Sequence, residues 1–105
     1  MSQQKLTKIH QRISEIKQDL QTIEEMRPGS LTKQYARPKE KKGSYYQISY
    51  TLNMKSHTDY VRKEFVEDLE KQVENYKKFK RLTKEWVSLA IKLSKLKIEV
   101  SLKNK

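Results

Sequence analysis

The sequence predicts an α+β fold with an N-terminal helix, a three-stranded antiparallel β-meander and a long C-terminal helix, the two helices pairing in a coiled-coil-like manner. Apolar residues spaced three and four apart near both chain ends predict the helices, and alternating residues between them predict the strands. At 105 residues, the chain is expected to form a single domain over residues 1–105. Its two glycines and two prolines supply little of the turn chemistry that a sandwich or a barrel needs.

The first helix is predicted over residues 5–26. Its apolar positions follow the a/d pattern for about two and a half heptads, so a partner helix in the same chain or in a second chain would satisfy it. These positions are Leu6, Ile9, Ile13, Ile16, Leu20 and Ile23. The run Arg27-Pro28-Gly29 is expected to stop the helix, because proline disfavours helical geometry in the residue before it.

The long C-terminal helix is predicted over residues 63–100, with a flexible tail at residues 101–105. Its apolar stripe becomes a regular heptad from Leu82 onward, so it can lie along the stripe of the first helix. We expect an antiparallel pair within the chain, although a parallel pair between two chains, and hence a homodimer, uses the same stripe. The stripe consists of Leu69, Val73, Tyr76, Phe79, Leu82, Trp86, Leu89, Leu93, Leu96 and Val100.

Three strands are predicted within residues 30–62, at Leu31–Arg37, Ser44–Leu52 and Ser56–Arg62. Side chains alternate between the two faces of a strand, so the middle strand should have one core face and one wet face. The expected core residues are Tyr46, Ile48, Tyr50 and Leu52, and the expected wet residues are Tyr45, Gln47, Ser49 and Thr51. A three-residue turn at Asn53-Met54-Lys55 would place Ile48 opposite Tyr60 on the core face.

The formal charge of +11 is concentrated around the predicted strands. Residues 1–26 are neutral, residues 27–63 carry nine bases and two acids, and residues 64–105 add a net +4. Basic residues interspersed with tyrosine, glutamine and hydroxyl groups suit phosphates and base edges. We therefore expect a nucleic-acid-binding protein that contacts duplex DNA, in preference to RNA, through a basic three-stranded sheet. The candidate contact residues are Lys33, Arg37, Lys39, Lys41, Lys42, Tyr45, Gln47, Ser49, Lys55, His57 and Arg62.

Other function classes lack the residues that they need. With no cysteine and two histidines the chain cannot build a typical closed zinc site, and we expect no metal or other cofactor. The sequence has no Ser/His/Asp order, glycine-rich phosphate loop or defined carboxylate pair, so we expect no enzyme. No stretch approaches the roughly 20 apolar residues of a membrane span, and no apolar segment of a secretory signal follows the N-terminus. The expected location is cytoplasmic, at the nucleoid if the protein binds DNA.

A protein-interaction role is the alternative. The heptad stripes can pair between chains, which would make a homo-oligomeric adaptor module whose basic surface binds an acidic protein partner. Nucleic-acid binding predicts an affinity that falls steeply with salt, whereas the adaptor predicts a stable oligomer.

Four runs carry a resemblance to known proteins: residues 27–31, the Gly-x-Tyr-Tyr-x-x-Ser-Tyr run from Gly43, residues 55–61, and the Asn-Tyr-x-x-Phe run from Asn75. Together they resemble a widespread prokaryotic family of short proteins of unknown function, some found near mobile elements. The resemblance implies a shared fold and, in relatives, cysteines in the loop where this chain has residues 36–42 with several lysines. The architecture also resembles the arm-binding domains of phage integrases and plant-type DNA readers, whose three-stranded sheets enter the major groove.

Overall fold

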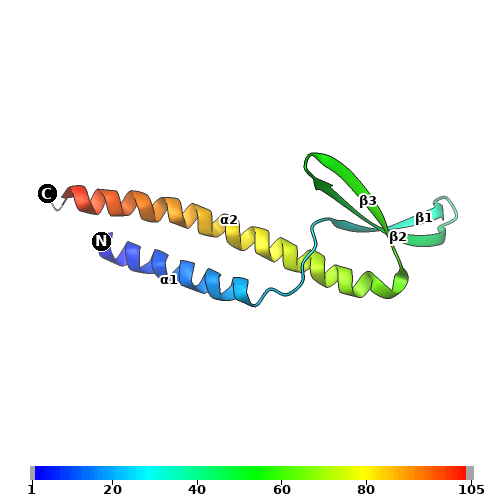
Figure 1. Ribbon diagram of the computed structural model, residues 1–105, viewed down its shortest axis with the longest axis horizontal. Coiled ribbons are helices and arrows are strands. Elements are labelled where there is room, and N and C mark those ends of the chain that lie inside the picture. The colour runs from blue at the N-terminus through cyan, green and yellow to red at the C-terminus, as the bar shows by residue number, and fades with distance from the viewer. Residues whose placement is uncertain (1, 104–105) are drawn as a thin grey trace. The chain divides into compact units, whose positions relative to one another are not determined.

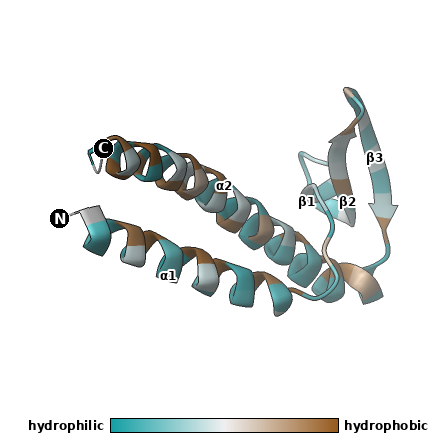
Figure 2. Cartoon of the chain, turned by 60° about the vertical axis from the view of Figure 1, so that its left-hand side comes forward, coloured by the Kyte–Doolittle hydropathy of each residue, from teal (hydrophilic) through white to brown (hydrophobic). Residues whose placement is uncertain are grey.

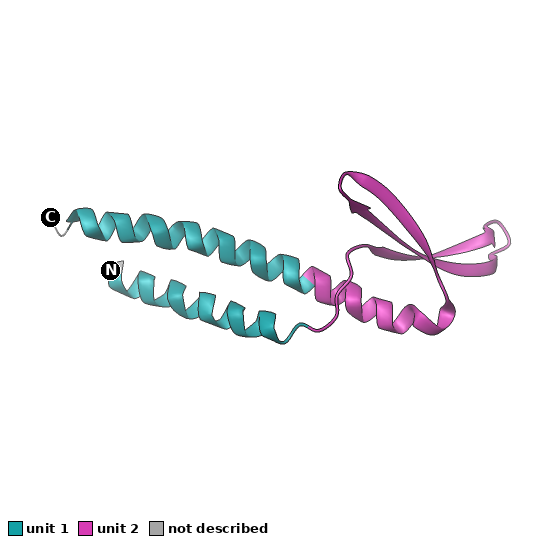
Figure 3. Cartoon of the chain, viewed as in Figure 1, with its two compact units in different colours: residues 1–23, 78–105 teal, residues 24–77 magenta. Residues whose placement is uncertain are grey.

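The computed structural model describes residues 2–103 (Figure 1). Along the chain it has α1 (Ser2–Gln21), β1 (Ser30–Arg37), β2 (Lys42–Leu52), β3 (Lys55–Val61), a 3₁₀ turn (Lys63–Phe65) and α2 (Val66–Lys103). This order confirms the predicted α+β fold. The chain forms two compact units, which is a finer division than the single domain predicted (Figure 3). The helical unit comprises residues 1–23 and 78–105, and the sheet unit comprises residues 24–77.

The helical unit is an antiparallel pair made by α1 and the later part of α2 (Figure 1). The apolar side of α1 faces α2 (Figure 2), and Ile13, Ile16 and Leu82 are buried. These three residues belong to the predicted heptad stripes, so the predicted helix pairing forms within one chain.

A bidentate ion pair also joins the two helices of the helical unit. The Arg12 guanidinium donates from Nε and Nη2 to the Glu85 carboxylate, at 2.6 and 2.9 Å. These hydrogen bonds lower the pKa of Glu85. The Lys17 ammonium lies 5.3 Å from the centroid of the Trp86 ring, within the range of a cation–π contact.

The helix boundaries differ from the predicted ones at each end. α1 begins at Ser2 and ends at Gln21, so the predicted stop at residues 27–29 is wrong. The reason is local: the Thr22 hydroxyl and backbone N–H both donate to the Asp19 carbonyl, at 2.6 and 3.1 Å, and this closes the last turn early. α2 begins at Val66 after a 3₁₀ turn and stays helical to Lys103, so the predicted tail is wrong for residues 101–103. Residues 104–105 lie outside the described residues.

The sheet is an antiparallel meander in the order β1-β2-β3. Asn53 and Met54 form a two-residue turn with φ angles of 52° and 65°, since Leu52 pairs with Lys55. The predicted three-residue loop is therefore wrong, and Ile48 lies opposite Asp59 rather than Tyr60. A register change of one residue moves every side chain of a strand to the other face, so Tyr60 leaves the core face.

The two faces of the sheet differ in what covers them. The helix-side face packs Ile48 and Val61 against Val73 of α2, and these three residues are buried. Leu31, Tyr46, Val66 and Leu69 pack around this core. Leu52, predicted as a core residue, is 57% exposed because it lies at the hairpin end, beyond the α2 contact. The opposite face, which we call the open face, carries none of the buried residues of the sheet unit.

Hydrogen bonds to the start of α2 hold the backbone of the segment before β1 within the sheet unit. The Arg27 N–H donates to the Gln72 carbonyl at 3.0 Å, and the Asn75 amide donates to the Glu25 carbonyl at 2.9 Å. Gly29 has a φ of +137°, and a Cβ at this position would lie 2.8 Å from the Ser49 carbonyl oxygen. Glycine is therefore required here both by the backbone conformation and by the close approach of β2.

Candidate nucleic-acid interface

The open face of the sheet has no charged side chain at its paired positions. Every paired residue on this face is serine, threonine, glutamine or tyrosine. These residues are Ser30, Thr32 and Gln34 of β1, Tyr45, Gln47, Ser49 and Thr51 of β2, and Ser56, Thr58 and Tyr60 of β3. Hydroxyl and amide groups both donate and accept hydrogen bonds, so the open face can contact neutral polar groups such as base edges.

Two tyrosines from neighbouring strands meet on the open face. The ring centroids of Tyr45 and Tyr60 are 6.4 Å apart and the ring planes are inclined at 32°. Tyr60 is 69% exposed and lies opposite Gln47 in the register. Tyr60 is absent from the predicted contact residues because the predicted turn is one residue too long. The signal that could have found it is Asn53, since asparagine tolerates the positive φ that a two-residue hairpin turn requires.

Basic residues gather at the end of the sheet where β1 turns into β2. Arg37 pairs with Lys42 across this turn, and Lys39 and Lys41 lie within it. Val61 pairs with Tyr46, so the residue after β3, Arg62, lies at the same end. Arg37 is 3.7 Å from the Glu40 carboxylate, but both side chains are well exposed and such a pair contributes little. We call Arg37, Lys39, Lys41, Lys42 and Arg62 the basic end of the sheet.

The structure places the remaining predicted contact residues elsewhere. Lys33 lies on the helix-side face opposite Tyr46, in a hollow that Glu70 and Glu74 also line. His57 stacks on the Tyr50 ring of that same face, with centroids 5.1 Å apart and an interplanar angle of 19°. Lys55 lies at the other hairpin turn. These three residues therefore do not share a face with Tyr45, Gln47 and Ser49.

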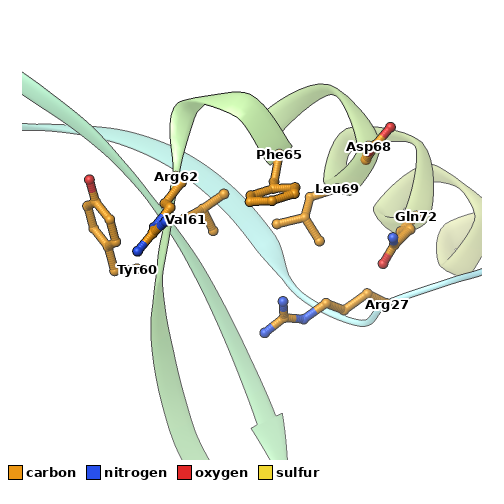
Figure 4. Close-up of a pocket in the computed structure, with 8 residues that line it drawn as sticks. All are labelled: Arg27, Tyr60, Val61, Arg62, Phe65, Asp68, Leu69 and Gln72. Carbon is orange, nitrogen blue, oxygen red and sulfur yellow. The ribbon is translucent and has the colours of Figure 1, made fainter.

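A hollow of about 340 Å³ borders the basic end, with Val61, Phe65 and Leu69 among its lining residues (Figure 4). Arg27 and Arg62 both line this hollow, but their guanidinium groups differ in availability. Arg27 donates to the Asp59 carboxylate at 2.6 Å and lies over the Tyr50 ring at 5.5 Å, so its guanidinium is already engaged within the sheet unit. Arg62 has no ion pair with any residue in the described range 2–103. Arg62 is therefore the guanidinium of this hollow that is free for an anionic ligand.

The net charge of the sheet unit is small, but its basic and acidic residues lie in different parts of the unit. The unit holds eleven bases and nine acids, a net charge of +2, whereas the helical unit holds thirteen bases and four acids, a net charge of +9. Six of the nine acids lie in two short stretches outside the strands. Two precede β1, at residues 24–25, and four lie in the 3₁₀ turn and the start of α2, at residues 64–70. The basic end contains five bases with Glu40 as its neighbouring acid. Local segregation, and not net charge, distinguishes this end of the sheet.

Neither a metal centre nor a membrane span is found within residues 2–103. No group of three or more histidine, aspartate or glutamate side chains there is arranged to hold a metal ion. None of the helices in this range combines the length and the apolar character that crossing a membrane requires.

Comparison with known proteins places the chain in a family. No curated protein and no solved structure matches it. One family model, described as a domain of unknown function (DUF6788), matches residues 6–71, which span most of α1, all three strands and the start of α2. The Asn75-Tyr76-Lys77-Lys78-Phe79 run lies outside the matched range. Since the match covers more than half of the chain, this protein belongs to the DUF6788 family.

Proposed function

We propose that this protein binds nucleic acid, without catalysing a reaction, by placing the open face of its sheet in the major groove of duplex DNA. The observation that carries the proposal is the composition of that face, which is entirely serine, threonine, glutamine and tyrosine at its paired positions and is bordered by the basic end. Neutral hydrogen-bonding groups suit base edges, and the bordering lysines and arginines suit phosphates.

The dimensions of the sheet are compatible with this docking. Three strands about 4.8 Å apart span roughly 10 Å between the outer strand axes. The major groove of B-DNA is about 12 Å wide, so a narrow sheet can enter it with one face toward the bases. Gln47 is the side chain on the central strand best suited to adenine, because a glutamine amide can contact adenine in a bidentate manner.

The phosphate contacts would come from the basic end. If its five bases each neutralise one phosphate, log affinity should fall with log salt with a slope of about −4.5. The affinity itself would depend on these contacts for all DNA sequences, whereas Gln47 and the serine and threonine side chains would set any preference among sequences.

The test combines a salt series with two kinds of substitution in a gel-shift or anisotropy assay on duplex DNA. Lys41→Gln with Lys42→Gln should weaken binding to all sequences and make the salt slope less steep by about 2. Gln47→Ala should leave the slope unchanged and reduce discrimination at one position by about 1–3 kcal/mol. Tyr60→Ser should weaken binding on duplex DNA while leaving the fold intact, because this ring is exposed.

The matched control is Lys92→Gln with Lys103→Gln, which removes two exposed lysines from the more basic helical unit. Binding should change little in this control. Equal weakening by the two lysine pairs would show general attraction to the net charge of the chain and would exclude the basic end as the specific contact. Absence of binding near physiological salt would exclude nucleic-acid binding as a whole, and tighter binding to single strands or RNA would exclude the duplex as the target.

The cellular role that we propose is a small regulatory or mobile-element accessory function in prokaryotes, with the protein cytoplasmic and associated with the nucleoid. This rests on the resemblance of the Gly-x-Tyr-Tyr-x-x-Ser-Tyr and Asn-Tyr-x-x-Phe runs, since the family description itself carries no function. Its test is co-purification of chromosomal DNA with the wild-type protein and its reduction in Lys41→Gln with Lys42→Gln.

A protein-interaction module is the second candidate, either as a homodimer or through an acidic partner. One observation favours it: four large aliphatic side chains of α2 are well exposed, at Val87, Ile91, Ile98 and Leu102. A row of this kind is typical of a surface that another protein covers. Light scattering over a concentration series tests the homodimer, which a strictly monomeric mass would exclude.

A further inference from the structure

α2 carries a second apolar stripe in the helical unit, apart from the one that pairs with α1. Its members are Val87, Ile91, Ile98 and Leu102, which are 60%, 53%, 58% and 66% exposed. At 3.6 residues per turn this stripe lies on roughly the opposite side of the helix from Leu82, Leu89 and Leu96. We call these four residues the outer stripe. An amphipathic helix in a globular unit normally has one apolar side, so the outer stripe needs a separate explanation.

The spacing of the outer stripe is that of a helix–helix seam. Val87, Ile91 and Ile98 fall at d, a and a of a heptad whose intervening d position is Ser94, and Leu102 lies at the flanking e position. The d positions Ser94 and Ser101 and the flanking Ala90 are small residues that allow another helix to approach closely. The partner that fits this surface is therefore another α-helix.

The charges beside the seam determine what kind of helix fits. In this heptad the charged e and g positions are Arg81, Lys95 and Lys97, and none of these positions is acidic. A second copy of α2 has no acidic e or g residue in this heptad to offer these basic side chains in either orientation, so self-pairing would gain no ion pair across the seam. The helical unit as a whole also has a net charge of +9. Self-pairing is therefore opposed, and acidic flanks on the partner are favoured.

We infer that the outer stripe is a docking surface for an amphipathic helix of another protein, whose apolar seam is flanked by glutamate or aspartate. The aliphatic side chains supply the buried area, and Arg81, Lys95 and Lys97 select the partner by charge. This inference narrows the second candidate function to one class of partner and does not depend on nucleic-acid binding. The seam is about two heptads long, so the complex should be short-lived and sensitive to salt.

The experiment uses the full chain and three synthetic peptides in a fluorescence-anisotropy titration. The first peptide has isoleucine and leucine at a and d and glutamate at e and g, the second has lysine at e and g, and the third is a scrambled form of the first. We expect the first peptide to bind at least ten times more tightly than the other two. Equal binding of the first and scrambled peptides would show general attraction to a basic protein, and it would overturn the proposal.

Two double variants locate the binding surface. Ile91→Ser with Ile98→Ser should weaken binding of the acidic peptide at least tenfold. The matched control is Leu52→Ser with Met54→Ser, which removes two exposed apolar residues from the sheet unit and should leave binding unchanged. Both variants should keep the circular dichroism spectrum of the wild type, since all four positions are exposed. Equal losses in the two variants would overturn the proposal.

A charge reversal keeps the test independent of folding losses. Lys95→Glu with Lys97→Glu should invert the preference, so that the lysine-flanked peptide binds more tightly than the glutamate-flanked one. A gain of binding cannot arise from misfolding. Two other outcomes would overturn the proposal: a dimer in light scattering that Ile91→Ser with Ile98→Ser abolishes, or binding to vesicles of anionic lipid with no binding to any peptide.

Discussion

The two units of this chain are stabilised in different ways: the helical unit by a periodic apolar stripe, and the sheet unit by contacts of individual residues. The helical unit buries one periodic stripe, has a net charge of +9 and leaves a second apolar stripe exposed on α2. The sheet unit has a net charge of +2, and its linker is fixed by individual contacts such as those of Arg27 with Asp59 and Gln72. In the first unit periodicity carries the structure. In the second, a few single residues decide which side chains reach the surface.

The largest effects should come from the two fully buried isoleucines, one in each unit. Ile16→Ala and Ile48→Ala each leave a cavity at a position that is 0% exposed, and each should lower the free energy of unfolding by about 2–5 kcal/mol. Trp86 is the single tryptophan and lies in the helical unit, so its fluorescence reports that unit. We expect Ile16→Ala to shift the fluorescence transition most and Ile48→Ala to accelerate amide exchange in the strands most.

The matched control for both variants is Ile91→Ala, an isoleucine that is 53% exposed. Its free energy of unfolding should change by no more than about 0.5 kcal/mol. If Ile16→Ala and Ile48→Ala shifted both signals equally, the two units would unfold as one cooperative body, and the contrast between them would not extend to their stabilities.

A second prediction concerns Gly29, whose backbone conformation the sheet unit requires. The helical unit contains no glycine. Gly29→Ala would force a Cβ to within 2.8 Å of the Ser49 carbonyl oxygen in a backbone conformation that favours glycine. We expect a loss of about 1–3 kcal/mol, seen in strand amide exchange with little change in Trp86 fluorescence. Ser30→Ala, at the next and exposed position, is the control and should behave as the wild type. A neutral Gly29→Ala would show that the linker can move away from β2.

The same contrast explains which features the sequence could predict. The stripe through Ile13, Ile16 and Leu82 repeats, so an error at one position does not change the predicted face, and the predicted helix pair is confirmed. The register of β3 depends on one turn residue, and a turn that includes Lys55 puts Tyr60 on the wrong face. The end of α1 is marked by the hydrogen bonds from the Thr22 hydroxyl and N–H to the Asp19 carbonyl, local contacts that no periodicity shows.

In the candidate site too, the repeating pattern predicts some residues correctly, whereas others depend on the strand register. Alternation alone predicts the wet face for Tyr45, Gln47 and Ser49, and the structure places them there. Lys33 and His57 are predicted from charge and residue type alone, with no face of the sheet assigned to them. Both lie on the helix-side face. Composition identifies basic residues that lie near each other in the chain, but only the register shows which of them share a surface.

The smallest effect should come from the ion pair that joins the helices of the helical unit. The Arg12 hydrogen bonds lower the folded-state pKa of Glu85 below the usual value of a glutamate. The contribution of the pair is therefore present in full above the unfolded-state pKa and is lost as the pH falls through the folded-state pKa. Glu85→Gln should thus lower stability slightly at pH 7 and have no effect once Glu85 is protonated in acid.

The measurement for Glu85→Gln is urea denaturation followed by Trp86 fluorescence at several pH values. Glu99→Gln, an exposed acid with no ion pair among residues 2–103, is the control and should give no such pH-dependent difference. A Glu85→Gln deficit that persisted at low pH would show that Glu85 acts by packing rather than by charge. The helix pair would then depend on its apolar stripe alone, and the contrast with the contact-by-contact construction of the sheet unit would be sharper.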